Sequence, residues 1–210
     1  MTEYTAVVMN DMQIRFMDDE IVYGLVVPFL RDLKPKRVIF NGDVVDCLGF
    51  SDLYMSRDHV KSHGLKEEIR GAGKLMAAVQ HVPEKDWLGG NHEDRWRRMT
   101  WRHPSLEGML QSFPDAFHMS DYGFRWHEYG ESILLGKLYV THGQMVRAHS
   151  GVTARAHFER FGQSVLIGHT HRGGVYYKTN MKGPHGAWEN FCLCHLTPDW
   201  VKNPDWQQGF

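Results

Sequence analysis

The sequence predicts an α/β fold. Three observations support this prediction: an apolar run, a helical stretch and a second apolar run follow one another within the first 41 residues, further strand-like runs recur along the chain, and polar residues come directly after several of these runs. A strand–helix–strand order of this kind is typical of a sheet with helices packed on it.

The first half of the chain alternates between strands and helices. Strands are indicated by short apolar runs and helices by apolar residues at helical spacing. The predicted elements of this half are a strand at about 5–10, a helix at about 18–32, a strand in "KRVIF", a helix at about 64–81, a strand in "DWLGG" and a helix at about 94–112 that Pro104 interrupts.

The second half is richer in strands. The predicted elements are strands in "SILLG", "KLYVTHG", "SVLIGHTH", "GVYYKT" and "ENFCLCHL", with one helix at about 151–161. We find neither an internal repeat nor a long linker, so residues 1–210 are expected to form a single domain.

Composition excludes several classes of protein. An apolar content of 42% and a net charge of -1 argue against wholesale disorder and against a general polyanion binder. The longest apolar stretch, "IVYGLVVPFL", has about half the length that a membrane span needs, and Gly24 and Pro28 interrupt it. The start, "MTEYT", lacks the basic region of a signal peptide. We therefore expect a cytoplasmic protein without membrane contact, and its oligomeric state stays open.

Polar side chains follow the predicted strands at the points where the strands end. The C-terminal ends of strands in an open α/β sheet face a common crevice, where ligands bind. Five residues with side chains suited to metal binding occupy such positions: Asp11, Asp43, Asn91, His142 and His169. We expect these side chains to converge.

Five motifs in chain order carry a family resemblance. They are Asp11-x-Gln13, "GDVVD", "GGNHED", "THG" and "GHTH". Together they resemble the pattern of the calcineurin-like metallophosphoesterases, which is DxH, GDxxD, GNH followed by Glu or Asp, a lone His, and GHxH. The resemblance spans residues 11–171 and implies a four-layer αββα sandwich with two divalent metal ions.

The resemblance also implies a ligand set. Asp11, Gln13 and His171 would hold one metal, Asn91, His142 and His169 the other, and Asp43 would bridge them. Two such ions bind phosphate oxygens, and a hydroxide that bridges them becomes a nucleophile because coordination lowers the pKa of water toward about 7. The resulting positive cluster favours an anionic substrate.

Gln13 stands where the family usually has His, so the first motif is DxQ. Its amide oxygen is neutral, like imidazole, but harder, and it suits Mn²⁺, Mg²⁺ or Ca²⁺ better than Zn²⁺. We expect Mn²⁺ as the cofactor, with Mg²⁺, Fe, Ca²⁺ and Zn²⁺ as alternatives. A second interpretation stays open, in which Gln13 points elsewhere and only one metal binds tightly.

His92 and Asp46 are the candidate catalytic pair. In the family the residue at the position of His92 does not bind metal, and it is placed either to protonate the leaving-group oxygen or to hold a phosphate oxygen. Asp46 would fix its tautomer from behind.

An Arg- and Trp-rich segment at about 94–128 is a candidate cap over the metals. Arg95, Arg98 and Arg102 would share one helical face, while Arg97 and Trp101 pair at i, i+4. Arg98 and Arg102, together with His149 after "THG", are the candidate substrate-binding residues. The alternative is a solvated basic face with its aromatic residues in the core.

The three cysteines form no disulfide-framework spacing. Cys192 and Cys194 in "CLCH" would share one face of a strand, but we interpret them as buried thiols of the core rather than as metal ligands.

The sequence therefore predicts an enzyme: a binuclear metal-dependent phosphohydrolase, and specifically a phosphodiesterase acting on small nucleotide diesters such as cyclic nucleotides. Two alternatives stay open. One is a metal-dependent nuclease acting on DNA or RNA, and the other is a non-catalytic scaffold with the same fold.

Overall fold

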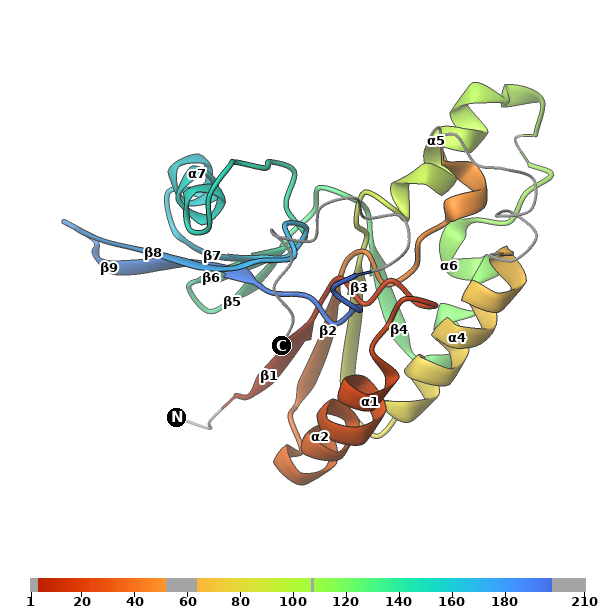
Figure 1. Cartoon of the computed structure of the whole chain (residues 1–210), viewed down its shortest axis with the longest axis horizontal. Coiled ribbons are helices and arrows are strands. Elements are labelled where there is room, and N and C mark those ends of the chain that lie inside the picture. Colours follow the sequence, from red (N-terminus) through yellow and green to blue (C-terminus); the bar gives the residue numbers. More distant parts are fainter. Residues whose placement is uncertain (1–3, 52–63, 107, 198–210) are drawn as a thin grey trace.

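Two β-sheets pack face to face, and helices cover their outer faces. The computed structural model describes residues 4–51, 64–106 and 108–197. Figure 1 shows α7 on one side of the second sheet, and α2 and α4 on the far side of the first. The predicted four-layer αββα sandwich is confirmed.

The first sheet is parallel, with strand order β1-β2-β3-β4. Its strands are β1 (Ala6–Met9), β2 (Arg37–Asn41), β3 (Glu84–Leu88) and β4 (Phe124–His127). Its helices and helical turns are α1 (Asp19–Ile21), η1 (Val22–Val26), α2 (Val27–Leu33), η2 (Leu48–Phe50), α4 (Leu65–Ala78), α5 (Asp94–Arg102), η3 (Pro104–Leu106), α6 (Phe113–Ala116) and η4 (Met119–Tyr122).

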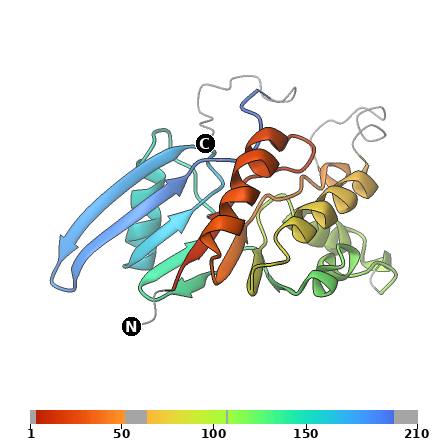
Figure 2. The same cartoon turned by 90° about the horizontal axis from the view of Figure 1, so that it is seen from below.

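The second sheet is mixed, with strand order β5-β6-β7-β9-β8. Its elements are β5 (Ile133–Leu135), β6 (Leu138–Thr141), α7 (Val152–Phe161), β7 (Ser164–Ile167), β8 (Gly173–Asn180) and β9 (Gly183–Asn190). β6, β7 and β9 run parallel, and β5 and β8 are antiparallel edges. In Figures 1 and 2 the hairpin of β8 and β9 extends at the edge of the molecule farthest from α4.

Successive side chains of each strand point to opposite faces of its sheet, and apolar side chains on these faces form three layers. On β2, Val38 and Phe40 pack toward the outer helices, whereas Ile39 packs with Val140 of β6 between the sheets. A second outer layer forms where Phe158 of α7 covers the other sheet. β2 is therefore apolar on both faces, as expected of a central parallel strand.

Several elements differ from the sequence prediction. The helix predicted at about 94–112 ends at Arg102, before Pro104, and β9 begins at Gly183, six residues before the strand predicted in "ENFCLCHL". The helix at 18–32 contains a π-helical turn, η1, just before Pro28, which has no N–H to donate to the preceding turn. β4 lies within the segment 94–128 and was not predicted. The strand predicted in "ENFCLCHL" is wrong beyond Asn190, because Phe191 takes a left-handed backbone (φ 38°) and ends the pairing.

Asp86 in the middle of β3 anchors a charge network that connects β2, β3 and β4. Its fully buried carboxylate accepts hydrogen bonds from Arg37 Nε (2.7 Å), Arg125 Nη2 (3.0 Å) and His127 Nε2 (2.8 Å). Burial alone would raise the pKa of Asp86, but these hydrogen bonds lower it below its ordinary range.

Replacing Asp86 with alanine should lower the free energy of unfolding by about 2 to 4 kcal/mol, because the cations of β2 and β4 would lose their shared partner. Urea denaturation measures this change. Asp32→Ala, at an exposed site in α2, is the matched control and should change stability by less than about 0.5 kcal/mol. Equal effects of the two substitutions would contradict a structural role for the network.

Candidate metal centre

The seven predicted ligands lie at the C-terminal ends of strands from both sheets. Asp11 follows β1, Asp43 follows β2 and Asn91 follows β3. The histidines come from the other sheet, where one residue follows β6 and two follow β7. We call the full set the donor cluster: Asp11, Gln13, Asp43, Asn91, His142, His169 and His171.

Asp43 connects the two halves of the donor cluster. Its carboxylate and one atom each of His142 and His169 lie within 4.8 Å of one another. The same holds for a second group, which consists of Asp43, Asp11 and His171. Asp43 therefore belongs to both groups that could hold a cation.

Asn91 and Gln13 extend the two groups. Asn91 Oδ1 lies 3.1 Å from His142 Nε2, and Gln13 Nε2 lies 3.4 Å from His171 Nε2. Gln13 is 1% exposed, and among the described residues its Oε1 has no hydrogen-bond partner. A buried acceptor without a donor is unfavourable, so this oxygen fits a place beside a cation. The carboxylate and amide oxygens suit Mn²⁺ or Mg²⁺, and the imidazole nitrogens suit transition metals such as Fe²⁺ or Zn²⁺.

Charges within the donor cluster shift its pKa values strongly. Burial alone lowers the pKa of His142, but the Asp43 carboxylate raises it to about 10. Burial likewise opposes the effect of Asp11, which raises the pKa of His171 to about 9. Burial and the charge of His142 lower the pKa of His169 to about 4. Ligands that share protons in this way release them when a metal binds.

The backbone of the donor cluster is unusual. Five of its seven residues have left-handed φ values: Asp11 (52°), Gln13 (43°), Asp43 (49°), His169 (69°) and His171 (52°). Residues with a Cβ rarely adopt this conformation, and outliers of this kind gather at functional sites. The sharp turns direct the side chains of alternate loop residues to one place.

Glu93, which the sequence did not single out as a functional residue, holds two of these loops together. Its buried carboxylate accepts hydrogen bonds from the backbone N–H of Asp43 (3.0 Å), Val44 (2.8 Å) and Gly90 (2.8 Å). Gly90 lies so close to Asp43 that a Cβ at this position would overlap the carboxylate. The available signal was the acidic residue that follows "GNH" in the sequence.

His92 and Asp46 lie together beside Asp43. His92 Nδ1 donates to Asp46 Oδ1 (2.6 Å), and His92 Nε2 lies 3.7 Å from Asp43 Oδ2. The backbone N–H of His92 also donates to Asp43 Oδ1 (3.0 Å). The imidazole therefore presents Nε2 to the donor cluster, while Asp46 holds the opposite edge of the ring.

Arginines of α5 contact the loops that carry these residues. Arg95 Nη1 donates to the carbonyl of Asp46 (2.7 Å), and Arg98 Nη2 donates to the carbonyl of Asn91 (3.1 Å). Arg98 also pairs with Asp94 (3.0 Å), yet its side chain is 42% exposed. α5 therefore starts directly at the donor cluster.

The remaining candidate substrate residues lie on the surface. Arg102 at the end of α5 and His149 in the loop before α7 are both exposed. The guanidinium of Arg97 lies 4.4 Å from the ring centroid of Trp101, which is 65% exposed. The predicted pair at i, i+4 therefore forms, and it faces solvent.

Glu68 of α4 is a buried acid close to the loop that carries Asp46. Its Oε2 accepts from the backbone N–H of Cys47 (2.7 Å), and burial followed by the charge of Asp46 raises its pKa from 4.5 to about 7. The folded state thus binds this proton more tightly than the unfolded state does. The stability contributed by the proton is complete below pH 4.5 and is lost as the pH rises toward about 7.

Replacing Glu68 with glutamine keeps an acceptor for Cys47 and removes the charge. The variant should be more stable than the original protein by about 1 to 3 kcal/mol at pH 8 and nearly equal to it at pH 4.5. Thermal melts in chelator at both pH values measure the difference. A difference independent of pH would show that Glu68 does not titrate in this range.

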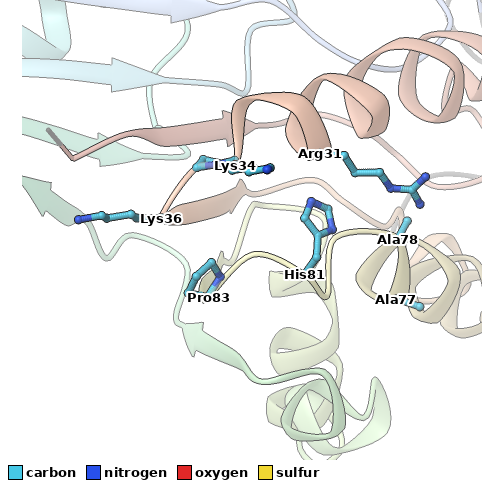
Figure 3. A pocket seen from close by; sticks show the side chains of 8 residues that line it. Arg31, Lys34, Lys36, Ala77, Ala78, His81 and Pro83 are labelled. Atoms are coloured by element: carbon cyan, nitrogen blue, oxygen red, sulfur yellow. The ribbon is translucent and has the colours of Figure 1, made fainter.

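A basic hollow lies away from the donor cluster, between the ends of α2 and α4. Figure 3 shows that Arg31, Lys34, Lys36 and His81 surround it. Among the described residues, none that lines the hollow is acidic, so its charge is positive and does not suit a divalent cation.

Within residues 4–51, 64–106 and 108–197, no helix combines the length and apolar character that crossing a membrane requires. No protein-family model matches the sequence. The chain is 28% identical over 226 aligned positions to the Gene 54 protein of Mycobacterium phage D29, and the alignment covers 97% of this chain and 86% of that protein. Among solved structures, it is similar to the Pseudomonas putida nuclease MPE, with a TM-score of 0.45 and 12% identity over 95% of this chain and 80% of that chain.

Proposed function

We propose that this protein is a metal-dependent phosphodiesterase of the calcineurin-like metallophosphoesterase type, with the DxQ form of the first motif. The observation that carries the proposal is the position of Asp43, whose carboxylate belongs to both groups of potential ligands. A carboxylate shared in this way is what a pair of adjacent cations needs.

The donor cluster divides into two ligand sets. Asp11, Gln13 and His171 would hold one divalent cation, Asn91, His142 and His169 the other, and Asp43 both. When bound, two such cations polarise phosphate oxygens and lower the pKa of water. The amide oxygens in both sets favour Mn²⁺ over Zn²⁺.

His92 supplies the proton for the leaving group. Its Nδ1 is held by Asp46 at 2.6 Å, so Nε2 is oriented toward the donor cluster and can donate to an oxygen of the substrate. A scaffold without catalysis has no use for an oriented proton donor. An alkoxide leaving group needs that proton, which favours phosphodiesters over activated monoesters.

The surface around α5 favours a nucleic acid over a single cyclic nucleotide. A cleft of about 340 Å³ lies along this helix and includes Arg97, Trp126 and Tyr129. The ring centroid of Tyr129 lies 6.3 Å from that of His142, so the cleft begins beside the donor cluster. The cleft is also lined by Glu93, Asp94 and Glu128, so its aromatic rings rather than its charge suit stacking with the bases of a single strand. Trp101, which contacts Arg97, extends this surface.

The proposal is tested with a panel of substrates and metals. We expect Mn²⁺ to support hydrolysis of bis-p-nitrophenyl phosphate and of single-stranded oligonucleotides, with slower hydrolysis of p-nitrophenyl phosphate and of cyclic nucleotides. A chelator should abolish all activity and added Mn²⁺ should restore it. The proposal would be overturned if activity survived the chelator. It would also be overturned if the protein hydrolysed none of these substrates with Mn²⁺, Mg²⁺, Fe²⁺ or Zn²⁺.

The substrate class is tested separately with charge reversals on α5. Arg102→Glu should reduce oligonucleotide cleavage at least about 10-fold and change hydrolysis of the small diester much less. Arg98→Glu also breaks the contact with the carbonyl of Asn91, so it should slow hydrolysis of both substrates. Arg155→Glu, on the exposed face of α7, is the matched control. Equal losses on both substrates from Arg102→Glu would favour small diesters as the natural class.

A further inference from the structure

Two thiols lie directly behind the donor cluster. After β9 the chain runs along residues 11–17, where Leu193 N–H donates to the carbonyl of Asp11 (3.2 Å) and Cys194 forms an isolated antiparallel bridge with Met17. Cys192 and Cys194 are two positions apart, so their side chains share one side of this segment. That side faces His171.

The thiols and the imidazole form a compact, buried group. Cys194 Sγ lies 3.8 Å from His171 Nδ1, and the three potential ligand atoms all lie within 4.8 Å of one another. Cys192, Cys194 and His171 are 2%, 3% and 7% exposed. Two ligands of one tetrahedral Zn²⁺, a sulfur and a nitrogen, are about 3.6 Å apart, so only a small adjustment is needed.

The two nitrogens of His171 face different groups. Nε2 lies 3.2 Å from Asp11 Oδ1, within the donor cluster, whereas Nδ1 faces Cys194. The donor cluster offers mainly oxygen and nitrogen ligands, which suit Mn²⁺. Two thiols with an imidazole instead match the ligands of Zn²⁺ sites.

We propose that Cys192, Cys194 and His171 form a separate site for Zn²⁺. On binding, both thiols and Nδ1 of His171 release their protons to solvent, and the two thiolates balance the charge of the ion. If Nε2 of His171 holds a cation of the donor cluster at the same time, the ring bridges the two ions as an imidazolate, and its second proton also goes to solvent. The site does not require the proposed function. It rests on that function only in sharing His171, through which Zn²⁺ at the thiols and Mn²⁺ in the donor cluster would influence each other.

The test follows Co²⁺ as a probe for Zn²⁺. Titration of the reduced protein with Co²⁺ should produce the near-ultraviolet charge-transfer absorption of thiolate–Co²⁺ bonds, and one equivalent of Zn²⁺ should remove it. Cys192→Ser and Cys194→Ser should each weaken the absorption, and the double variant should lose it. Cys47→Ser is the matched control, because Cys47 is also buried but has no place in this group.

Two further measurements keep the proposal falsifiable if the double variant does not fold. X-ray absorption of the original protein with one equivalent of Zn²⁺ should show sulfur ligands at about 2.3 Å. Asp43→Asn should keep the cobalt–thiolate absorption even where diester hydrolysis is lost, which separates this site from the proposed catalytic function. Zinc bound without sulfur, or a cobalt spectrum unchanged in the double variant, would overturn the proposal.

Discussion

Replacing Asp43 with asparagine is expected to reduce hydrolysis of bis-p-nitrophenyl phosphate by about 10³-fold or more. Asp43 is shared by both groups of potential ligands, so the substitution removes a negative charge from each cation at once. A loss of several kcal/mol of transition-state stabilisation corresponds to a factor of this size. Initial rates at saturating Mn²⁺ measure the change.

Metal binding should decline together with activity. The original protein should bind two equivalents of Mn²⁺ by electron paramagnetic resonance titration, and Asp43→Asn should bind fewer and more weakly. Asp32→Asn, in an exposed turn of α2, should keep both properties. A fully active Asp43→Asn protein would rule out the binuclear arrangement.

Replacing His92 with asparagine is expected to lower kcat by about 10² to 10⁴-fold while two equivalents of Mn²⁺ still bind. The imidazole contacts Asp46 and Asp43 and belongs to neither group of potential ligands. The loss should be larger for a diester with a poor alkoxide leaving group than for one that releases p-nitrophenolate, because p-nitrophenolate leaves without a proton.

The leaving-group dependence separates proton donation from a structural effect. His118→Asn, at an exposed position, serves as the control. If His92→Asn slowed both kinds of diester by the same factor, His92 would bind the phosphate rather than protonate the leaving group. If the variant lost a metal equivalent, the assignment of His92 outside the ligand sets would be wrong.

Local patterns predicted the strand ends well because polar residues there interrupt apolar runs. Asp11, Asp43 and His142 come directly after, or within two residues of, the ends of β1, β2 and β6. Their convergence also requires two sheets to place their C-terminal ends side by side, which the sequence indicated only through the family resemblance.

Other features depend on contacts that a local pattern does not contain. In the sequence, Glu93 is an acidic residue shortly before a helix. Its hydrogen bonds from backbone N–H groups form only once the two loops are packed together. β4 is only four residues long and includes the charged Arg125, so its alternation of apolar and polar residues is weak. Its extended conformation depends on hydrogen bonding to β3. Cys192 and Cys194 form a group with His171 because Phe191 turns the chain away from the sheet, and an apolar run does not predict a left-handed residue.

The left-handed loop residues have a consequence for evolution. Each side chain held in that conformation costs the fold on the order of 1 kcal/mol relative to glycine. A descendant released from the need to keep cations would gain stability by mutating Gln13 or His171 to glycine. Glycine at these aligned positions in a relative would therefore mark a lineage that has retained the architecture and abandoned the chemistry.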